Sequence, residues 1–299
     1  MSLLHRAART LNQKLDRIEP IDLAILLTLA LILVRPGPGD PWYLAISTTI
    51  LGIAGLLWRD FARQAWFWFV LGAIFFGVNN VERWAVSDNH KFLTSYWCLA
   101  VAICLCVRDR EEALATTGRL LIGLVFLFAT IWKITSNDYL TGETFHFLLI
   151  SDVRFFPLAY LFCDFPPELC YANQQALEAS LGSLSPTIPL QGTDAMPGFA
   201  TFLTWFTVAI EGIIAVLFLI PPQQPLAKWR DAVLLSFVVV TYPPTNVIHF
   251  GWVLIAMAVA QCPKEHRGTR LAYVVSFLFI FCFSTGLFRQ NLYDWLTGL

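Results

Sequence analysis

The sequence has little charge for its length. Only 14% of its 299 residues are Asp, Glu, Lys or Arg, whereas a soluble domain usually carries about 25%. Hydrophobic residues make up 57%, and the mean hydropathy is +0.62. A chain of this composition cannot cover a water-facing surface of its size with polar side chains. The composition therefore predicts an integral membrane protein.

Several functional signatures are also missing. The 7 cysteines contain no CxxC pair, so neither a zinc site nor a redox dithiol is predicted. The 20 Lys and Arg are balanced by 21 Asp and Glu, so no basic surface for nucleic acid is expected. There is no glycine-rich phosphate loop and no internal repeat. The functional information must therefore lie in the apolar segments and in the polar residues within them.

Apolar segments recur along the whole chain. Several are shorter than the roughly 20 residues that a perpendicular spanning helix needs, but flanking Trp, Tyr and Arg can complete a span. The pattern predicts an all-α, polytopic transmembrane helical bundle of about nine spans, with residues 1–299 forming one domain. The segments over residues 228–242 and 247–261 are separated only by a short Pro-Pro turn. They form either a hairpin across the membrane or a re-entrant pair. The expected spans are residues 21–34, 42–58, 64–81, 92–107, 119–134, 199–220, 228–242, 247–261 and 270–288.

Basic residues are distributed unevenly between the two sides of these spans. With the N-terminus in the cytoplasm, most Lys and Arg fall in cytoplasmic segments, which is the positive-inside pattern. Lys133 lies within a span, and the cationic residues of the outer segments are only Arg35, Arg83, Lys91, Arg154 and Arg289. We therefore expect a cytoplasmic N-terminus and an outer C-terminus.

The connection over residues 135–198 is the one long segment outside the predicted spans. Its amphipathic stretch from Phe145 to Phe162 is expected to lie on the outer membrane surface. The whole connection would then form an extracytoplasmic loop that caps the bundle. Cys163 and Cys170 lie in it, on the oxidising side by this topology, and either form a disulfide or remain thiols.

Polar residues within apolar spans are costly and usually face a cavity or a partner. Lys133 lies near the outer end of one span. Glu211 lies in the middle of another, with Thr207 on the same helical face. The topology places further polar residues near the outer side as well. We expect one outward-facing cavity, with Glu211 below it, formed by Asn89, His90, Lys133, Asn246 and His249.

Each of these residues has an alternative interpretation. Lys133 is close enough to its span end for the ammonium to reach the outer headgroups. Glu211 could pair with a buried donor for structure alone. His90 and His249 could be hydrogen-bonded packing residues.

Four short motifs, taken in order, resemble a known family. FLFATIWKITSNDYLTGETFHF has a lysine, Lys133, at the end of an apolar helix, followed by a polar turn, an acidic-aromatic pair and a glycine. VSDNHKFLTSYWCL, WFTVAIEGIIAVLFLIPP and TNVIHFGWVL carry Asn89-His90, Glu211 and His249 respectively. Together these segments resemble the membrane core of vitamin K-dependent gamma-carboxylases and their bacterial relatives, the horizontally transferred transmembrane (HTTM) domain proteins.

The resemblance implies roles for the polar residues. In the carboxylases a lysine is the proposed weak base that deprotonates reduced vitamin K, so Lys133 would be the base here, with Asn89 and His90 shaping the pocket. A lysine among apolar neighbours is desolvated, which makes the neutral amine more accessible. A reduced, vitamin K-like quinone would be the cofactor, because it suits an apolar intramembrane cavity. The residues expected to bind the substrate are His249, Asn246, Glu211 and Trp132.

Two functional hypotheses follow. The first is a quinol-dependent membrane enzyme, with carboxylase- or epoxidase-like chemistry at Lys133. Glutamate carboxylation itself is not expected, because the carboxylases carry a large extramembrane C-terminal region and this chain ends soon after its last expected span. The second is a non-catalytic membrane subunit that binds lipid, quinone or a protein partner in the membrane. A small-solute transporter is disfavoured because no matched pair of broken spans indicates inverted repeats.

The resemblance is to the short bacterial form. It therefore implies a multi-pass protein of the inner (cytoplasmic) cell membrane, with membrane lipids as its general partners.

Overall fold

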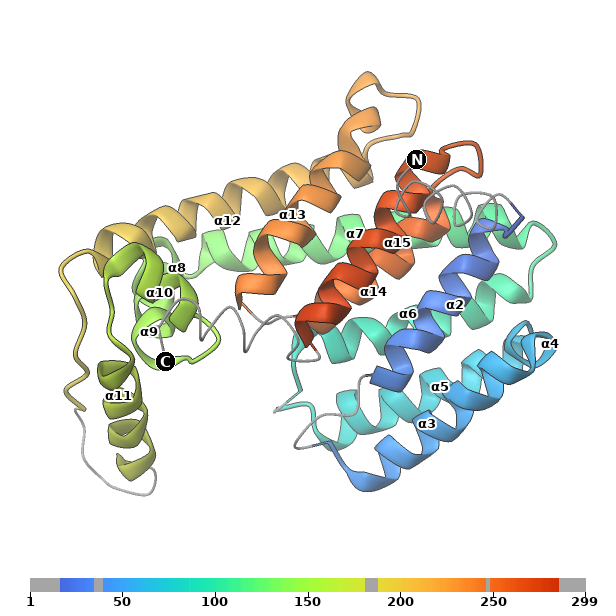
Figure 1. The fold of residues 1–299 in the computed structure, drawn as a ribbon. Helices are drawn as coiled ribbons and strands as arrows, with labels where there is room; N and C mark the ends of the chain where they lie inside the picture. Colours follow the sequence, from blue (N-terminus) through green and yellow to red (C-terminus); the bar gives the residue numbers. More distant parts are fainter. Residues whose placement is uncertain (1–16, 35–39, 86, 181–187, 246–247, 285–299) are drawn as a thin grey trace, which may run out of the picture. The chain divides into compact units, whose positions relative to one another are not determined.

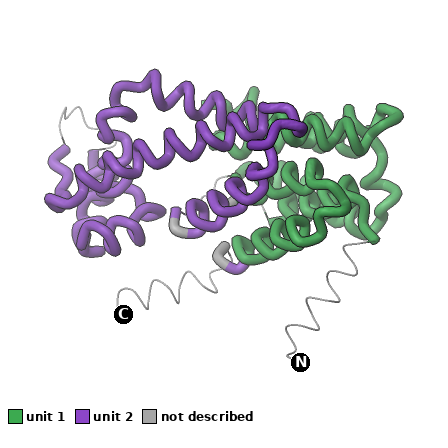
Figure 2. The backbone as a smooth tube through the Cα atoms, turned by 90° about the horizontal axis from the view of Figure 1, so that it is seen from above, with its two compact units in different colours: residues 1–122, 249–281 green, residues 123–248, 282–299 purple. Residues whose placement is uncertain are grey.

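The structure is a computed structural model of the chain, and it describes residues 17–34, 40–85, 87–180, 188–245 and 248–284. Every regular element within these residues is a helix, so the predicted all-α class is confirmed (Figure 1). The chain forms two compact units, unit 1 over residues 1–122 and 249–281 and unit 2 over residues 123–248 and 282–299 (Figure 2). The single domain expected over residues 1–299 stays a prediction.

Unit 1 contains the first half of the chain and a pair of helices from its C-terminal part. The boundary between the units falls inside α7 (Arg110–Thr135), whose residues 110–122 belong to unit 1. The other helices of unit 1 are α2 (Pro20–Val34), α3 (Trp42–Leu57), α4 (Arg59–Ala62), α5 (Ala65–Phe76), the π-helix η1 (Gly77–Glu82), α6 (Asn89–Leu105), α14 (Ile248–Gln261) and α15 (Arg267–Ser284).

Unit 2 contains the C-terminal half of α7 and the segments that follow it. Its remaining helices are α8 (Asn137–Leu140), α9 (Glu143–Ser151), α10 (Phe156–Cys163), α11 (Pro167–Ser180), α12 (Met196–Leu219), the 3-10 helix η2 (Pro225–Trp229) and α13 (Arg230–Thr245).

Each of the nine apolar segments predicted from the sequence coincides with a helix, although two boundaries differ. α7 begins at Arg110 and not near residue 119, because the polar stretch before the apolar segment is rich in Ala, Glu, Leu and Arg, which favour helix. α13 continues to Thr245 and includes Pro243 and Pro244, so the expected Pro-Pro turn lies inside a helix. The Thr245 hydroxyl supports this last turn by donating to the Thr241 carbonyl at 2.7 Å.

Three of the helical segments are long and apolar enough to cross a membrane, namely residues 65–82, 110–135 and 196–219. A fourth crossing is possible if α9 and α10 together make one broken span, since they meet at a bend of 101°. Three shorter apolar helices, over residues 20–34, 42–57 and 249–261, lack the length for a full crossing by themselves. The long apolar helices agree with a membrane protein.

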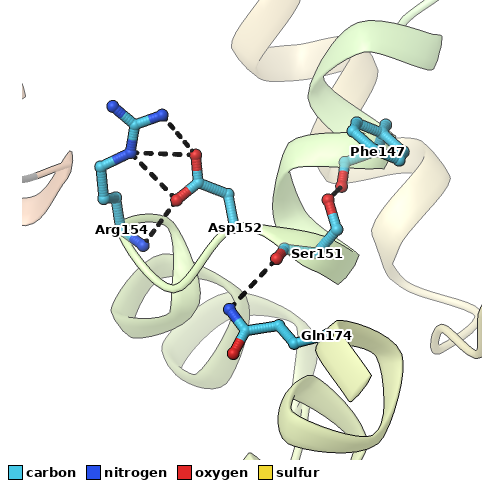
Figure 3. Close-up of polar contacts among 5 residues, drawn as sticks. All are labelled: Phe147, Ser151, Asp152, Arg154 and Gln174. Carbon is cyan, nitrogen blue, oxygen red and sulfur yellow. Dashed lines mark hydrogen bonds and ion pairs between the residues drawn. The ribbon is translucent and has the colours of Figure 1, made fainter. Parts of the chain in front are cut away.

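The 135–198 connection differs from the expected turn-rich loop, because it is largely helical. The predicted amphipathic stretch is interrupted after Ser151, where Asp152 and Arg154 form a tight turn (Figure 3). The Asp152 carboxylate accepts hydrogen bonds from the Arg154 backbone N–H at 2.9 Å and from its Nη2 at 2.6 Å. An Asp side chain that bonds the backbone two residues later competes with helix formation. This local competition explains the break that the apolar periodicity did not reveal.

Two further contacts fix the helices on either side of this turn. The Ser151 hydroxyl donates to the Phe147 carbonyl at 2.5 Å, and the Gln174 amide donates to the Ser151 carbonyl at 3.3 Å (Figure 3). Asn173 of α11 is buried and donates to the Ile150 and Gln191 carbonyls, both at 2.8 Å. These polar contacts join α9, α11 and the segment at Gln191 around an apolar core that includes Leu149.

Candidate functional site

The polar site of unit 2 lies between α7 and α12, which pack closely and run antiparallel (Figure 1). A Cβ atom at Gly123 of α7 would lie 2.7 Å from Leu219 Cγ, near the end of α12. Further along α7, Thr130 lies against Gly212, 3.7 Å from the position of a Cβ there. A Cβ at Gly123 would clash with Leu219, whereas one at Gly212 would make an ordinary contact, so it is Gly123 that allows the close approach. This register brings Lys133, one turn beyond Thr130, level with Glu211.

Lys133 and Glu211 form an ion pair between Nζ and Oε2. The two side chains are mostly buried, with exposed fractions of 14% for Lys133 and 11% for Glu211. Glu211 lies more than two turns from both ends of α12. The Lys133 ammonium is therefore directed at a carboxylate within the helix pair, and Lys133 is the donor that pairs with Glu211.

Tyr139 and Thr207 extend this pair. The Lys133 Nζ lies 5.5 Å from the centroid of the Tyr139 ring, within the range of a cation–π contact. The Tyr139 hydroxyl lies 2.6 Å from Thr207 Oγ1. Because the Thr207 hydroxyl already donates to the Leu203 and Thr204 carbonyls at 2.9 Å, it accepts the proton of Tyr139. Burial raises the pKa of the Tyr139 hydroxyl, so it remains a donor at neutral pH.

The polar turn after Lys133 sets the position of Tyr139. Ser136 caps α8, since its Oγ accepts a hydrogen bond from the Tyr139 backbone N–H at 3.4 Å. Gly142 ends the turn with φ of +85°, a left-handed conformation that favours glycine. A Cβ at Gly142 would also come within 3.3 Å of the Thr201 backbone nitrogen on α12. The sequence motif thus folds the chain back so that an aromatic ring lies beside the lysine.

A buried aromatic cluster joins α7 and α13 in unit 2. Tyr242 is buried, and the Phe237 ring contacts it edge to face at a centroid distance of 5.4 Å. Phe237 also contacts Phe126 of α7, at 5.3 Å. Sequence reasoning did not place Tyr139 beside Lys133, although the Lys-turn-Asp-Tyr order was an available signal for it.

Trp132, expected to bind substrate, lies on the outside of α7. Its ring is 60% exposed and contacts Tyr139 edge to face, with centroids 6.0 Å apart. Trp132 therefore borders the site through the Tyr139 ring.

The histidines form a second group, which belongs to unit 1. The rings of His90 and His249 are stacked, with centroids 5.3 Å apart and an interplanar angle of 16°. His249 also meets the edge of Trp252 at 5.4 Å. Trp252 is buried, and its indole N–H donates to the Phe277 carbonyl at 3.1 Å. The structure thus brings His90 and His249 together, and the buried Trp252 ring packs against His249.

The other predicted residues are placed as follows. Asn89 is the exposed first residue of α6, next to His90. Asn246 lies outside the described residues. The pair of Lys133 and Glu211 belongs to unit 2 and the histidine pair to unit 1. Their convergence on one cavity stays a prediction.

Cys163 and Cys170 are free thiols in the structure, the second of the two alternatives left open by the sequence. Both side chains are buried in the apolar core of the 135–198 connection. Burial raises the pKa of the Cys170 thiol, and the negative charge of Asp152 adds to the effect. A buried thiol with a raised pKa is a poor nucleophile. These two cysteines act as core residues in the described state.

Comparison of the chain with protein-family models, with curated proteins and with solved structures gives no match.

Proposed function

We propose that the chain is a nine-span membrane protein of the HTTM type and that its Lys133–Glu211 pair accepts a proton from a lipid-soluble quinol. The observation that carries the proposal is the position of the pair. It lies largely out of water between two helices that are each long and apolar enough to span a membrane. Ionisable residues in such surroundings are expensive and are usually functional.

The exposed surface of α3 supports the higher number of spans. Large apolar side chains at Ile46, Ile50 and Ile53 are exposed at helical spacing, which is unfavourable in water and suited to lipid. Exposed tryptophans, Trp42 and Trp58, lie at the two ends of the same helix. Such aromatic pairs are typical of the two interfaces of a membrane. At 1.5 Å per residue, α3 measures about 24 Å, and its flanks complete the crossing of a core about 30 Å thick.

The proposed orientation has the N-terminus in the cytoplasm, in the inner membrane. It follows from the excess of Lys and Arg at one set of helix ends. In this orientation the Lys133 end of α7 and the 135–198 connection are on the outer side.

The chemistry of the pair explains how a lysine can accept a proton beside a carboxylate. Outside water, the charged forms of Lys133 and Glu211 both lose hydration, so the neutral amine and carboxylic acid come closer in free energy to the ion pair. Movement of one proton from Lys133 Nζ to Glu211 Oε2 then leaves an amine lone pair. That amine can accept a proton from an acid beside it, and the resulting ammonium stabilises the anion that is formed.

A reduced quinone fits these residues as the partner acid. It would supply a phenolic proton and an apolar ring system. Lys133 Nζ would receive the proton, and the aromatic rings of Tyr139 and Trp132 would offer contacts to a flat ring. The Thr207 hydroxyl holds the Tyr139 hydroxyl and so keeps its ring in place.

The experiment uses the full chain in lipid nanodiscs, titrated with menadiol under anaerobic conditions. Deprotonation of bound menadiol is followed by its ultraviolet absorbance. We expect Lys133→Ala to abolish deprotonation, and Lys133→Arg to abolish it as well, because a guanidinium does not give up its proton. Lys228→Ala, the same change at an exposed lysine beside Trp229, is the matched control and retains the activity. Full deprotonation in Lys133→Arg would refute the proposal.

A non-catalytic membrane subunit is the second candidate, and one surface favours it. The rings of Phe162, Phe199, Phe202 and Phe206 form a continuous stack in unit 2, with neighbouring centroids 5.0 to 6.1 Å apart. Most of this stack is exposed. It would suit lipid chains or the apolar helix of a partner. Retained menadiol binding without any deprotonation in the wild-type protein would favour this candidate.

A further inference from the structure

A small cavity opens at one end of unit 1, between the start of α2, the end of α3 and α4. It has about 80 Å³ of water-accessible volume. Its lining combines apolar and charged side chains. The apolar lining residues include Ile25, Leu26, Leu29, Gly55 and Leu56, and the charged ones are Asp22, Arg59 and Arg63, of which both arginines are exposed and so mark its mouth.

The α2 wall of this cavity is held in place by three cations from other elements. Arg63 of the α4–α5 junction forms a bidentate pair with Asp22, at 2.9 Å and 2.5 Å. Lys264 pairs with Glu19. Arg270 of α15 is 1% exposed and donates from Nη2 to the Ile18 carbonyl at 2.6 Å. The cavity wall is therefore fixed before any ligand arrives.

Arg59 differs from these three cations. Its side chain is exposed at the mouth, and none of the residues that the structure describes pairs with its guanidinium. Arg63 beside it is already neutralised by Asp22. The mouth therefore presents one guanidinium whose five donors remain available to an anion.

The same end of unit 1 has the side chains of a membrane interface. Leu57 and Trp58 at the end of α3 are exposed, and so is Trp66 at the start of α5. Exposed tryptophans next to arginines are typical of the level at which lipid headgroups lie. Leu56, inside the cavity, is one turn from Ile53 on the exposed apolar face of α3. The cavity thus continues into a surface suited to an acyl chain.

We propose that this cavity binds an anionic phospholipid, with the phosphate on Arg59 and the first part of one acyl chain between α2 and α3. A volume of about 80 Å³ exceeds several-fold the roughly 10–15 Å³ that one water needs, so it admits a short run of methylenes and not a whole chain. The remainder of the acyl chain lies along the exposed apolar face of α3. The proposal rests on the membrane location of α2 and α3 given under Proposed function, and it is independent of proton transfer at Lys133.

The test is native mass spectrometry of the full chain in detergent, with phosphatidylglycerol and phosphatidylcholine of identical acyl chains added in competition. One arginine near a membrane surface contributes about a fivefold preference for an anionic lipid. We expect the wild-type protein to retain phosphatidylglycerol about fivefold more than phosphatidylcholine. Arg59→Gln should remove that preference. Arg108→Gln, a change at an exposed arginine outside the cavity, should leave it unchanged.

Two further arms identify the ligand. Leu26→Trp, which fills the interior, should lower retention of both lipids, whereas glycerol phosphate should not displace phosphatidylglycerol. Equal lipid preference in Arg59→Gln and wild type would overturn the site, and displacement by glycerol phosphate would show a phosphate site without an acyl chain. Lys133→Ala should leave the lipid preference unchanged. If Ile50→Cys reacts with a membrane-impermeant thiol reagent, α3 is in water and the membrane arrangement itself fails.

Discussion

Lys133 of α7 and Glu211 of α12 pair with each other across a helix interface where Gly123 allows α7 and α12 to approach. The contact joins residues far apart in sequence, and both side chains are largely withdrawn from water. A largely buried ion pair of this kind either stabilises the fold or serves a reaction.

Removing one member of the pair should destabilise the protein more than removing both. Lys133→Met leaves the Glu211 carboxylate without a counter-charge, and we expect a loss of about 3 kcal/mol in the free energy of unfolding. Lys133→Met with Glu211→Leu replaces the pair by apolar side chains of similar volume and should lie within about 1 kcal/mol of wild type. Thermal unfolding in detergent measures both. An equal loss in the single and double variants would contradict the pairing.

The hydroxyl of Tyr139 should make stability depend on pH in the alkaline range. Burial raises its pKa above the usual value near 10, so the folded state keeps the proton where the unfolded state loses it. This contribution is fully present below pH about 10 and is lost as the pH rises through the folded pKa. The thermal midpoint of wild type should therefore fall more steeply above pH about 10 than that of Tyr139→Phe. Parallel curves for the two proteins would count against a buried Tyr139 hydroxyl.

The bent pair of α9 and α10 can be tested as a span or as part of an outer cap. Cys106, after α6, is exposed, and Asp194, before α12, is exposed as well. If α7 is the only crossing between them, a membrane-impermeant maleimide on intact cells should label Cys in Asp194→Cys and should reach Cys106 only after permeabilisation. If α9 and α10 form a fourth crossing, both positions lie on the cytoplasmic side, and the maleimide should reach both only after permeabilisation. The buried Cys163 and Cys170 should not react in either case.

The stacked rings of His90 and His249 should stabilise the fold mainly by ring contacts and not by hydrogen bonds of their nitrogens. His249→Ala removes contacts with His90 and Trp252 and should cost about 1 kcal/mol in the free energy of unfolding. His249→Phe keeps a flat ring in the same place and should recover most of that loss. An equal loss in His249→Phe and His249→Ala would mean that the ring nitrogens, and not the stacking, stabilise this group.

The sequence was sufficient for the helices but not for all of their contacts. Apolar runs located the main helices of the described residues, because long apolar segments with few Gly and Pro residues favour helix. The break between α9 and α10 coincides with the Asp152–Arg154 turn and with Pro157 in the first turn of α10, and α7 extended through a polar stretch of good helix formers. Turn-forming residues can therefore interrupt a helix within an apolar segment, and good helix formers can extend one beyond it.

Part of the site was also predictable. Lys133 and Glu211 were recognisable because a charge in an apolar segment needs a partner. Their pairing with each other depended on the register of α7 against α12, which small residues such as Gly123 set through tertiary packing. The bond between Tyr139 and Thr207 likewise depended on the packing of the turn after Lys133 against α12, which the linear sequence does not reveal.

Whether the Lys133–Glu211 pair accepts a proton or serves only as a structural contact can be decided in one variant. Anaerobic deprotonation of menadiol is measured with the double variant Lys133→Met with Glu211→Leu, once its thermal midpoint has been shown to match wild type. We expect a folded protein, as stable as wild type, that leaves bound menadiol fully protonated. Deprotonation at the wild-type level in this stable variant would show that the pair serves the fold alone.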